Sequence, residues 1–343
     1  MSKPTALVAM SGGVDSSVAA ATMRDAGYDV VGVTLKLWGG DQDSGCCSVS
    51  DVEDARRVAA QLDIPHYVFN YTAEFDRDVV DPFVEAYGAG RTPNPCVECN
   101  RHLKFGALFE RADELGFEVV ATGHHAQVVA DGSRYRLMRG ADAAKDQSYV
   151  LYMLGQRELA RTRLPIGHMT KAEVRAAADR LGLRTATKAE SMDVCFVKRG
   201  QRREFVTDRL GARPGKIVDV TGDELGEHDG VAMFTVGQRR GVGVAAGERR
   251  YVVDVDAATA TVTLGRKSDL LRDEVRVHDW CWVDEVPSPD RVVWAQPRAH
   301  GETFAARVDG DRILALAPVA RVAPGQVVAV YDGDELLGGA IAS

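Results

Sequence analysis

Two short stretches of the chain carry residue types whose spacing suits chemistry. The first is Ser11-Gly12-Gly13-Val14-Asp15-Ser16-Ser17, in which glycines and serines flank an acid. Glycines let a backbone turn tightly and aim its N–H groups at one point, and serine hydroxyls add further donors. At the start of a helix such a loop favours an anion, because the helix N-terminus carries positive potential. The lysine of G-x-x-x-x-G-K-[ST] is missing, so the stretch is not a Walker A loop.

The second stretch is Thr92-Pro93-Asn94-Pro95-Cys96-Val97-Glu98-Cys99-Asn100, which contains the pattern Cys-x-x-Cys. At this spacing both sulfurs can reach one another or one metal centre, so the pattern is typical of redox and metal sites. The two prolines rule out a helix across the stretch and predict that Cys96 and Cys99 lie on a stiff, exposed loop. A third candidate thiol, Cys195, lies in Ser191-Met192-Asp193-Val194-Cys195-Phe196.

The elements that must position these residues alternate between strand and helix in the first half, which predicts a parallel sheet covered by helices. Apolar runs predict strands over 6–10, 30–35, 66–69 and 118–122. Helical signals cover 16–25, 51–62 with Asp51 as its cap, 76–87, 105–115 and 170–181. Ligands gather at the carboxyl ends of the strands in such sheets, so Leu35 and Gly123 should border the pocket of the glycine–serine loop.

The helical rhythm stops near residue 211, and short strands separated by glycine, proline and aspartate follow. Asp131-Gly132, Asp309-Gly310 and Asp332-Gly333 predict hairpin turns. Strands over 292–296, 304–308, 313–316, 327–331 and 336–340 can close into a small antiparallel barrel. We therefore expect an α/β domain over 1–205, a small, mostly β central domain over 206–272 and a C-terminal antiparallel β-barrel over 273–343.

The composition of the 343 residues, with 45% apolar and 27% charged, is that of a soluble globular protein of more than one domain. A formal net charge of −8 gives no overall attraction to nucleic acid, so RNA contacts must come from local basic patches. Candidates for such patches are Arg199, Arg202, Arg203, Arg239, Arg240, Arg249 and Arg250. No apolar run reaches membrane-span length and no signal-peptide pattern opens the chain, so we expect a cytoplasmic location. Six cysteines are too few for a disulfide scaffold of this size.

The SGGVDSS stretch resembles the pyrophosphate loop of the ATP pyrophosphatase enzymes, whose PP-loop domain is of the adenine nucleotide alpha hydrolase-like type. It is followed in order by GRTPNPCVECN, ATGHHA, Lys145-Asp146-Gln147-Ser148-Tyr149, Asp193-x-Cys195-Phe196 and Thr235-Val236-Gly237-Gln238-Arg239. Together these motifs are similar to those of the tRNA-specific 2-thiouridylase (MnmA/TrmU) family over almost the full chain. Members of that family replace the C2 oxygen of the anticodon wobble uridine with sulfur.

The resemblance implies that the loop binds ATP with Mg²⁺, that Asp15 helps to organise both, and that the uridine C2 oxygen attacks the α-phosphate. A persulfide on Cys195 then delivers the sulfur, and Cys99 attacks that persulfide, which leaves a Cys99–Cys195 disulfide. The implied ATP-contacting positions are Ala9, Met10, Ser11, Gly12, Gly13, Val14, Asp15, Ser16, Leu35 and Gly123. The implied tRNA-contacting positions are Asn94, Pro95, Cys96, His124, Lys145, Asp146, Gln147, Arg298 and Gln326. The implied partners are the anticodon arm of tRNA and a sulfur donor such as a cysteine desulfurase or a sulfur-relay protein.

Two positions depart from the family pattern. Many members carry aspartate where this chain has Cys96, so Cys96, Cys99 and Cys195 can instead hold a [4Fe–4S] cluster with one iron open to sulfide. Ala299 replaces an aromatic residue after Arg298, so base stacking is not expected there. Cys46, Cys47 and Cys281 are expected to have no catalytic part. The alternatives to thiolation are a small-molecule PP-loop ligase and a non-enzymatic, nucleotide-sensing RNA-binding protein with an iron–sulfur cluster.

Overall fold

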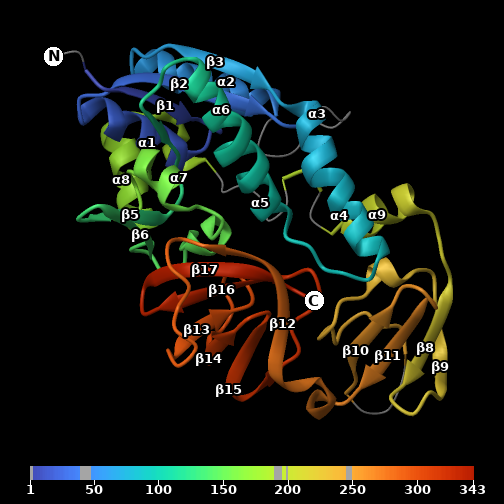
Figure 1. Cartoon of the computed structure of the whole chain (residues 1–343). Coiled ribbons are helices and arrows are strands. Elements are labelled where there is room, and N and C mark those ends of the chain that lie inside the picture. Colours follow the sequence, from blue (N-terminus) through green and yellow to red (C-terminus); the bar gives the residue numbers. More distant parts are fainter. Residues whose placement is uncertain (1–2, 39–47, 189–194, 198–199, 245–248) are drawn as a thin grey trace.

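The computed structural model describes residues 3–38, 48–188, 195–197, 200–244 and 249–343. These residues form a five-stranded, a four-stranded and an eight-stranded sheet (Figure 1). Cys46, Cys47, Arg199 and the stretch 191–194, which the sequence analysis names, lie outside the described residues. Within the described ranges, none of the helices is both long enough and apolar enough to cross a membrane.

The first sheet is parallel throughout, as predicted, and its strands follow the order β3-β2-β1-β4-β7. Their bounds are β1 (Thr5–Ala9), β2 (Asp29–Lys36), β3 (His66–Asn70), β4 (Val119–Ala121) and β7 (Thr162–Arg163). The central strand β1 is flanked by β2 and β4, so the chain segments that leave these three strands start at the same edge of the sheet. This edge is where a ligand of an open α/β sheet is expected.

Helices cover both faces of this sheet (Figure 1). On one face Ala6 and Val8 of β1 pack with α1 (Val14–Asp25), α2 (Val49–Gln61) and α8 (Lys171–Arg180). On the other face Leu7 packs with residues of α3 (Thr72–Phe75), α4 (Asp81–Gly88), α5 (Pro95–Glu98) and α6 (Leu108–Glu114). Side chains of a strand alternate between the faces, so β1 contributes to both apolar layers.

The remaining helical segments are short. Two α-helices are α7 (Gln156–Arg161) and α9 (Arg202–Leu210), and two π-helical segments cover Asp76–Val80 and Cys99–Ala107. Single 3₁₀ turns cover Ser148–Leu151, Arg184–Thr187, Val231–Met233 and Lys267–Leu270. The π-helical segments run directly into α4 and α6, so the predicted helices over 76–87 and 105–115 are parts of longer helical runs.

The prediction of an exposed loop at the two cysteines is wrong. Helix α5 starts at Pro95 and continues through the π-helical segment into α6, so Cys96 and Cys99 lie on successive parts of one helical run. Proline is tolerated in the first turn because its missing N–H has no partner there in any helix. Asn94 caps the helix, since its side chain accepts a hydrogen bond of 3.1 Å from the Cys96 N–H. Cys96 is exposed, whereas Cys99 is buried.

The cap of α2 also differs from the prediction. Ser48, rather than Asp51, is the N-cap, and Asp51 occupies position N3 of the helix, where it completes a capping box with Ser48. The Ser48 hydroxyl accepts a hydrogen bond of 3.1 Å from the Asp51 N–H, while the Asp51 carboxylate accepts one of 3.3 Å from the Ser48 N–H. By contrast, the capping box predicted at Thr170 and Glu173 is confirmed at the start of α8. Both boxes satisfy N–H groups that a helix leaves without internal partners.

The four-stranded sheet has the order β10-β11-β8-β9. Its strands are β8 (Gly215–Asp219), β9 (Glu224–His228), β10 (Tyr251–Asp256) and β11 (Thr261–Gly265). This part of the chain has a separate apolar cluster, formed by Ile217, Val231, Phe234, Val252, Ala260, Val262 and Leu264. This part of the chain is therefore a small, mostly β unit with a core of its own, as expected.

The eight-stranded sheet contains a closed barrel. Six antiparallel strands form a ring in the order β12-β15-β14-β13-β16-β17, and a further pairing between β17 and β12 closes it. The strands are β12 (Leu271–Trp282), β13 (Val293–Gln296), β14 (Phe304–Asp309), β15 (Arg312–Ala320), β16 (Val327–Asp332) and β17 (Glu335–Ala342). The predicted barrel and its hairpin turns at Gly310 and Gly333 are confirmed, both glycines having positive φ. Strand β12, which closes the ring, is not among the strands predicted from the sequence.

A hairpin of the first half extends this barrel sheet. Strands β5 (Ala126–Asp131) and β6 (Arg134–Arg139) turn at Gly132, as predicted, and β6 then pairs with β17. In this pairing Leu137 lies opposite Leu336, and both side chains are fully buried. The first domain and the barrel thus share one hydrogen-bonded sheet (Figure 1).

The Leu336→Ala protein should have a free energy of unfolding about 2–5 kcal/mol lower than the parent protein, because it removes buried apolar volume where two domains join. Urea denaturation measures this loss. The matched control is Leu316→Ala on β15, where the side chain is 49% exposed, and its effect should stay within about 0.5 kcal/mol. Equal losses in both proteins would contradict the assignment of Leu336 to the shared core.

Candidate active site

The glycine–serine loop joins β1 to α1 as predicted, and its geometry depends on glycine. Gly12 has a φ of +73°, and a Cβ at this position would collide with the backbone carbonyl of Asp51. The Ser16 hydroxyl accepts a hydrogen bond of 3.1 Å from the Ser11 N–H and donates one of 3.1 Å to the Gly13 carbonyl. These bonds fold the loop back over the first turn of α1. The N–H groups of that first turn remain aimed beyond the helix end, where an anion is favoured.

Gly123 closes this region from the neighbouring strand. It follows β4, and a Cβ there would come within 2.7 Å of the Ser16 nitrogen. Leu35 lies near the carboxyl end of β2 and is buried, as is Met10. The structure therefore brings all ten predicted ATP-contacting positions to one edge of the sheet. The side chains of Met10 and Leu35 are packed in apolar clusters, so a ligand would contact the backbone of these two residues rather than their side chains.

Asp15 is the electrostatic centre of the loop. Lys171, at the start of α8, donates to both of its carboxylate oxygens at 2.7 and 2.6 Å. The Nε2 atom of the buried His125 lies 3.2 Å from one of the same oxygens. Burial alone would raise the pKa of Asp15, but the bonds from His125 and Lys171 outweigh it, and the pKa lies below its ordinary value. Asp15 is thus held as a carboxylate beside the helix N-terminus.

A second lysine supports the loop from its other side. Lys188 donates to the Gly12 carbonyl at 3.0 Å and to the carboxylates of Asp51 and Asp54 at 2.6 Å each. Burial lowers the pKa of Lys188, but the bonds to Asp51 and Asp54 outweigh it and raise the pKa above its usual value. Two cations from distant parts of the chain therefore lie around a loop that lacks the lysine of a Walker A motif.

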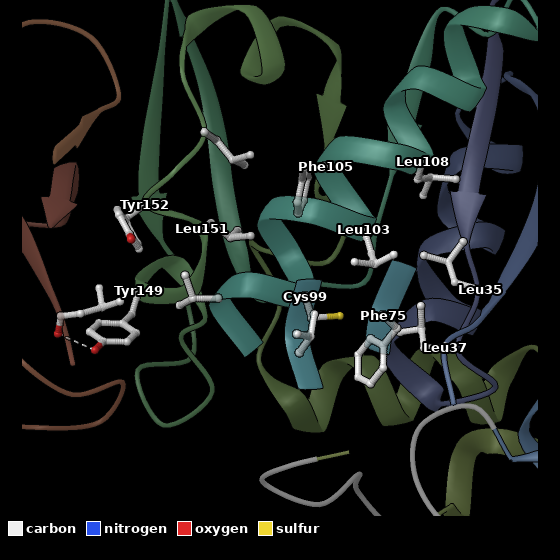
Figure 2. Close-up of a cluster of buried hydrophobic side chains, with 14 of the residues drawn as sticks. Leu35, Leu37, Phe75, Cys99, Leu103, Phe105, Leu108, Tyr149, Leu151 and Tyr152 are labelled. Carbon is white, nitrogen blue, oxygen red and sulfur yellow. Dashed lines mark hydrogen bonds between the residues drawn. The ribbon is translucent and has the colours of Figure 1, made fainter. Parts of the chain in front are cut away.

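Cys99 and Cys195 approach the same group of aromatic side chains. Cys99 is buried in the apolar layer, and its sulfur points to the side on which Phe75 and Leu37 lie (Figure 2). Cys195 packs against this layer, and its neighbour Phe196 lies edge-on to Phe75 with ring centroids 5.5 Å apart. Both cysteines are thiols rather than halves of a disulfide. Cys99, Phe75 and Cys195 thus belong to one apolar cluster.

Three cysteines do not form a metal site in this arrangement. Among the residues that the structure describes, which include Cys96, Cys99 and Cys195, no three His, Cys, Asp or Glu side chains are grouped to hold a metal ion. Cys96 is exposed and Cys99 is buried, although they are only three residues apart on a helical run. The residues as placed do not fit a [4Fe–4S] cluster, whose cysteine ligands must converge on one point.

Four of the predicted tRNA-contacting positions lie where the three domains meet. The loop that precedes Asn94, Pro95 and Cys96 is bound to the barrel by a hydrogen bond of 2.7 Å from the Thr92 N–H to the Pro324 carbonyl. Gln326 follows two residues after that carbonyl. The Thr92 hydroxyl also reaches the Thr235 hydroxyl of the central domain at 3.2 Å.

Arg298 lies at the same junction. Its guanidinium is 3.9 Å from the position that a Cβ on Gly237 would take, beside the Thr235 contact. Arg298 is exposed, and its positive charge lowers the pKa of the nearby Tyr149, although burial raises that pKa far more. Tyr149 in turn donates to the Val327 carbonyl at 2.7 Å, a bond drawn in Figure 2. At this junction Cys96 and Arg298 are exposed, Asn94 and Gln326 are half-buried, and Pro95 is buried.

The other predicted tRNA-contacting positions differ in exposure. Gln147 is exposed and Lys145 is half-buried, whereas Asp146 is only 4% exposed and is bonded within the protein. His124 is also buried, and its ring Nδ1 lies 2.8 Å from the Thr122 hydroxyl. Burial lowers the pKa of His124 well below its ordinary value, with Lys104 adding to the effect, so the ring is neutral. Asp146 and His124 are therefore placed to support the site rather than to face solvent.

Three residues around the loop were missed as site residues: His125, Lys171 and Lys188. Lys171 appears in the sequence only as part of a capping-box pattern, and His125 only as the second histidine of ATGHHA. The absent Walker lysine was the one available signal, because an anion site without it needs a cation from elsewhere. No local pattern indicated which lysine supplies it.

Family models match the chain in three consecutive parts. A tRNA methyl transferase HUP domain matches residues 4–199, a tRNA methyl transferase PRC-barrel domain matches 203–266, and an aminomethyltransferase beta-barrel domain matches 272–342. These ranges coincide with the parallel-sheet part, the small β part and the barrel. These descriptions are names of domain types.

Two relatives that match nearly the full chain carry the same name. A tRNA-specific 2-thiouridylase MnmA of Roseiflexus sp. is 48% identical over 97% of both chains. The protein of the same name from Chloroflexus aurantiacus is 49% identical over 97% of this chain and 96% of its own. Among solved structures, a 4-thiouridine synthetase–RNA complex with bound ATP is 18% identical over 56% of this chain and 44% of that one, with a TM-score of 0.38. That last similarity is too low to indicate function.

Gly123→Ala should lower the affinity for ATP at least tenfold, which corresponds to about 1.4 kcal/mol, because its methyl group would push the first turn of α1 away from the strand edge. Isothermal titration with ATP measures the change. Gly230→Ala is the matched control, since a Cβ there meets nothing within 4 Å. Unchanged affinity in the Gly123 variant would mean that ATP binds elsewhere.

The ion pair of Asp15 should make stability depend on pH in a defined direction. The folded-state pKa of Asp15 lies below the ordinary pKa of an aspartate side chain, so the unfolded chain takes up the proton first as the pH falls. The stabilisation by the carboxylate is therefore fully present above the unfolded-state pKa and is lost as the pH falls through the lowered value. The difference in unfolding free energy between the parent protein and Asp15→Asn should shrink over that window.

Urea denaturation at a series of pH values measures this difference. The control is Asp25→Asn at the exposed end of α1. This substitution should change the free energy of unfolding by no more than about 0.5 kcal/mol at each pH. An Asp15→Asn difference that grows on acidification would refute the assigned sign.

Proposed function

Because the chain belongs to the tRNA-specific 2-thiouridylase family, we propose that it replaces the C2 oxygen of the wobble uridine of tRNA with sulfur at the expense of ATP. The observation that carries this proposal is the joint presence of a glycine–serine loop at a helix N-terminus and two thiols that pack in one apolar cluster. Phosphoryl transfer activates the oxygen, and the thiols supply the sulfur. A PP-loop fold alone would support only the first half of the reaction.

In the first half-reaction the uridine C2 oxygen attacks the α-phosphate of ATP, and pyrophosphate leaves. The N–H groups at the start of α1 are suited to the phosphates, and Lys171 can offset the developing negative charge. Asp15 is a single, partly exposed carboxylate, which fits the one or two protein carboxylates that hold Mg²⁺ beside ATP phosphates. A bound Mg²⁺ would supply electrostatic stabilisation of the phosphoryl oxygens.

In the second half-reaction a persulfide on Cys195 donates its outer sulfur to C2, and AMP leaves. The Cys99 thiolate then attacks the Cys195 sulfur, which releases the thiocarbonyl and forms a Cys99–Cys195 disulfide. Each turnover therefore needs a donor that loads sulfur onto Cys195 and a thiol reductant that reopens the disulfide. The expected donor is a cysteine desulfurase or a sulfur-relay protein. The packing of both cysteines in one apolar cluster supports this division of roles.

The structure gives no support to an iron–sulfur route. Cys96, Cys99 and Cys195 are not grouped as ligands, and Cys96 is exposed at the helix start beside Asn94. This position suits a residue that borders the target base. Iron and acid-labile sulfide in protein purified without oxygen would contradict the persulfide route and favour the cluster.

The target uridine must leave its stack to reach these groups. The segment from Asn94 to Cys96, with Arg298 and Gln326, forms the junction surface onto which we expect the anticodon arm to bind. We also propose Lys145 and Gln147 as contacts with the tRNA, domain boundaries near 205 and 272, and action in the cytoplasm. The barrel and the central domain would then serve to hold the RNA over the helix end.

The test of this function is the dependence of pyrophosphate release on RNA. Release should require a tRNA with uridine at the wobble position, and 2-thiouridine should form when a persulfide donor is added. Asp15→Ala should slow pyrophosphate release by roughly 10²-fold or more, as expected for loss of a group that organises transition-state charge. Release that requires a carboxylate and ammonia instead would indicate a small-molecule ligase.

Cys99→Ala and Cys195→Ala should each form no detectable 2-thiouridine, measured by mass spectrometry of digested tRNA, while tRNA binding persists. Cys281→Ala is the matched control, because this thiol lies on β12 of the barrel and should be dispensable. Full turnover by Cys195→Ala would overturn the site assignment. Retained tRNA binding together with lost thiolation would exclude a purely RNA-binding role.

A further inference from the structure

A line of hydrogen bonds leaves the nucleotide loop and ends in the barrel. It starts at Asp15, whose carboxylate lies 3.2 Å from the ring of the buried His125. The backbone of His125 is fixed in both directions by Gln147. The His125 N–H donates to the Gln147 side-chain oxygen at 2.9 Å, and the Gln147 N–H donates to the His125 carbonyl at 2.8 Å. The turn that contains Gln147 thus sets the position of the histidine that contacts Asp15.

That turn is held by Asp146, which is 4% exposed. Its carboxylate accepts hydrogen bonds of 3.0 Å from the Gly140 and Ser148 N–H groups and of 2.9 Å from the Ser148 hydroxyl. The fourth bond, 2.7 Å long, comes from the guanidinium of Arg139 at the end of β6. A buried carboxylate with this many donors is fully satisfied within the protein and is fixed in place.

Arg139 carries the line across to the barrel. Its other terminal nitrogen donates to the Gln296 side chain of β13 at 2.6 Å, and its guanidinium carbon lies 3.7 Å from the centre of the Tyr331 ring on β16. Gln296 is 3% exposed and donates in turn to the carbonyls of Arg298 and Ala299 at 2.9 and 2.8 Å. The backbone of the exposed Arg298 is therefore fixed by the same set of bonds that fixes His125.

We propose that Arg139 and Gln296 are positioning residues that couple the nucleotide loop to the RNA-binding junction, so that ATP and tRNA bind with positive cooperativity. This inference rests on the proposed function and adds a relation between its two substrates. The planar fork of arginine suits the role, because it can hold a carboxylate on one arm and an amide on the other. A shift of the Arg298 loop on RNA binding would displace the side chain of Gln296 and then that of Arg139. The turn beside His125 would move in consequence.

Contiguity alone does not establish coupling, so the test measures the coupling itself. The affinity for α,β-methylene-ATP, which does not release pyrophosphate, is titrated with and without a full-length tRNA transcript. In the parent protein tRNA should raise this affinity by a factor in the usual allosteric range of about 5–150, and the analogue should raise the tRNA affinity by the same factor. Gln296→Met keeps the side-chain size and removes the bonds to Arg139 and to the Arg298 loop. Its coupling factor should fall below about two, while its RNA-free affinity for the analogue changes little.

Arg139→Lys is the second variant, since lysine retains the positive charge beside Asp146 but cannot hold both partners in a fork. The matched control is Arg136→Met, which removes another hairpin-to-barrel bond, the 2.6 Å ion pair between Arg136 and Glu335, without touching the line to Asp15. The control should keep the parent coupling factor. Thermal melting shows whether each variant is folded.

Three outcomes would overturn the inference: a coupling factor of one in the parent protein, a parent-like factor in folded Gln296→Met, or an equal loss of coupling in Arg136→Met. The last would assign the effect to the interface as a whole. Failure of the proposed function is distinguishable, because a protein without that function would release no pyrophosphate with tRNA. A protein that releases it but shows no coupling would disprove only the inference.

Discussion

The rest of the site depends on the carboxylate of Asp15 and the charges around it. The N-terminus of α1 and the ammonium group of Lys171 both bring positive charge to one point, and Asp15 compensates them before any ligand binds. Phosphate groups would enter a place where cations are already held in position, so little reorganisation is required when they bind. The constraint extends to the fold, because loops after β1 and β4 can meet α8 at one edge only if β4 lies beside β1.

The thiol half of the site is arranged by packing rather than by charge. Cys99 lies in the apolar layer beneath the sheet, and the segment of Cys195 reaches the same layer through the ring of Phe196. Phe196 also lies 5.3 Å from the ring of Phe83 and 6.0 Å from that of Trp38, so several aromatic side chains hold it. Aromatic rings supply large contact areas with defined geometry, which suits the positioning of a segment that contributes few residues.

Short sequence patterns were sufficient to predict much of the fold. The parallel sheet followed from apolar runs that alternate with helical signals, and the hairpins followed from Asp-Gly pairs at which glycine adopts a positive φ. Local rules failed at Pro95, where a proline that disfavours a helix interior stands at its first position. They failed again for the site cations, since Lys171 and Asp15 are 156 residues apart and His125 and Asp15 are 110 apart. Contacts between residues so far apart in the sequence depend on the tertiary fold, so no local sequence pattern predicts them.

The pairing of β6 with β17 has a consequence for how the protein is made. Strand β6 leaves the ribosome roughly two hundred residues before β17, to which it bonds. During that interval the first domain carries an unpaired strand edge, the kind of surface that other chains can join. Closing a contact across so much chain is also slow, because the entropy of a long loop is lost first. The β6 edge therefore stays open until β17 has been synthesised, and a chain without residues 335–342 cannot form this pairing.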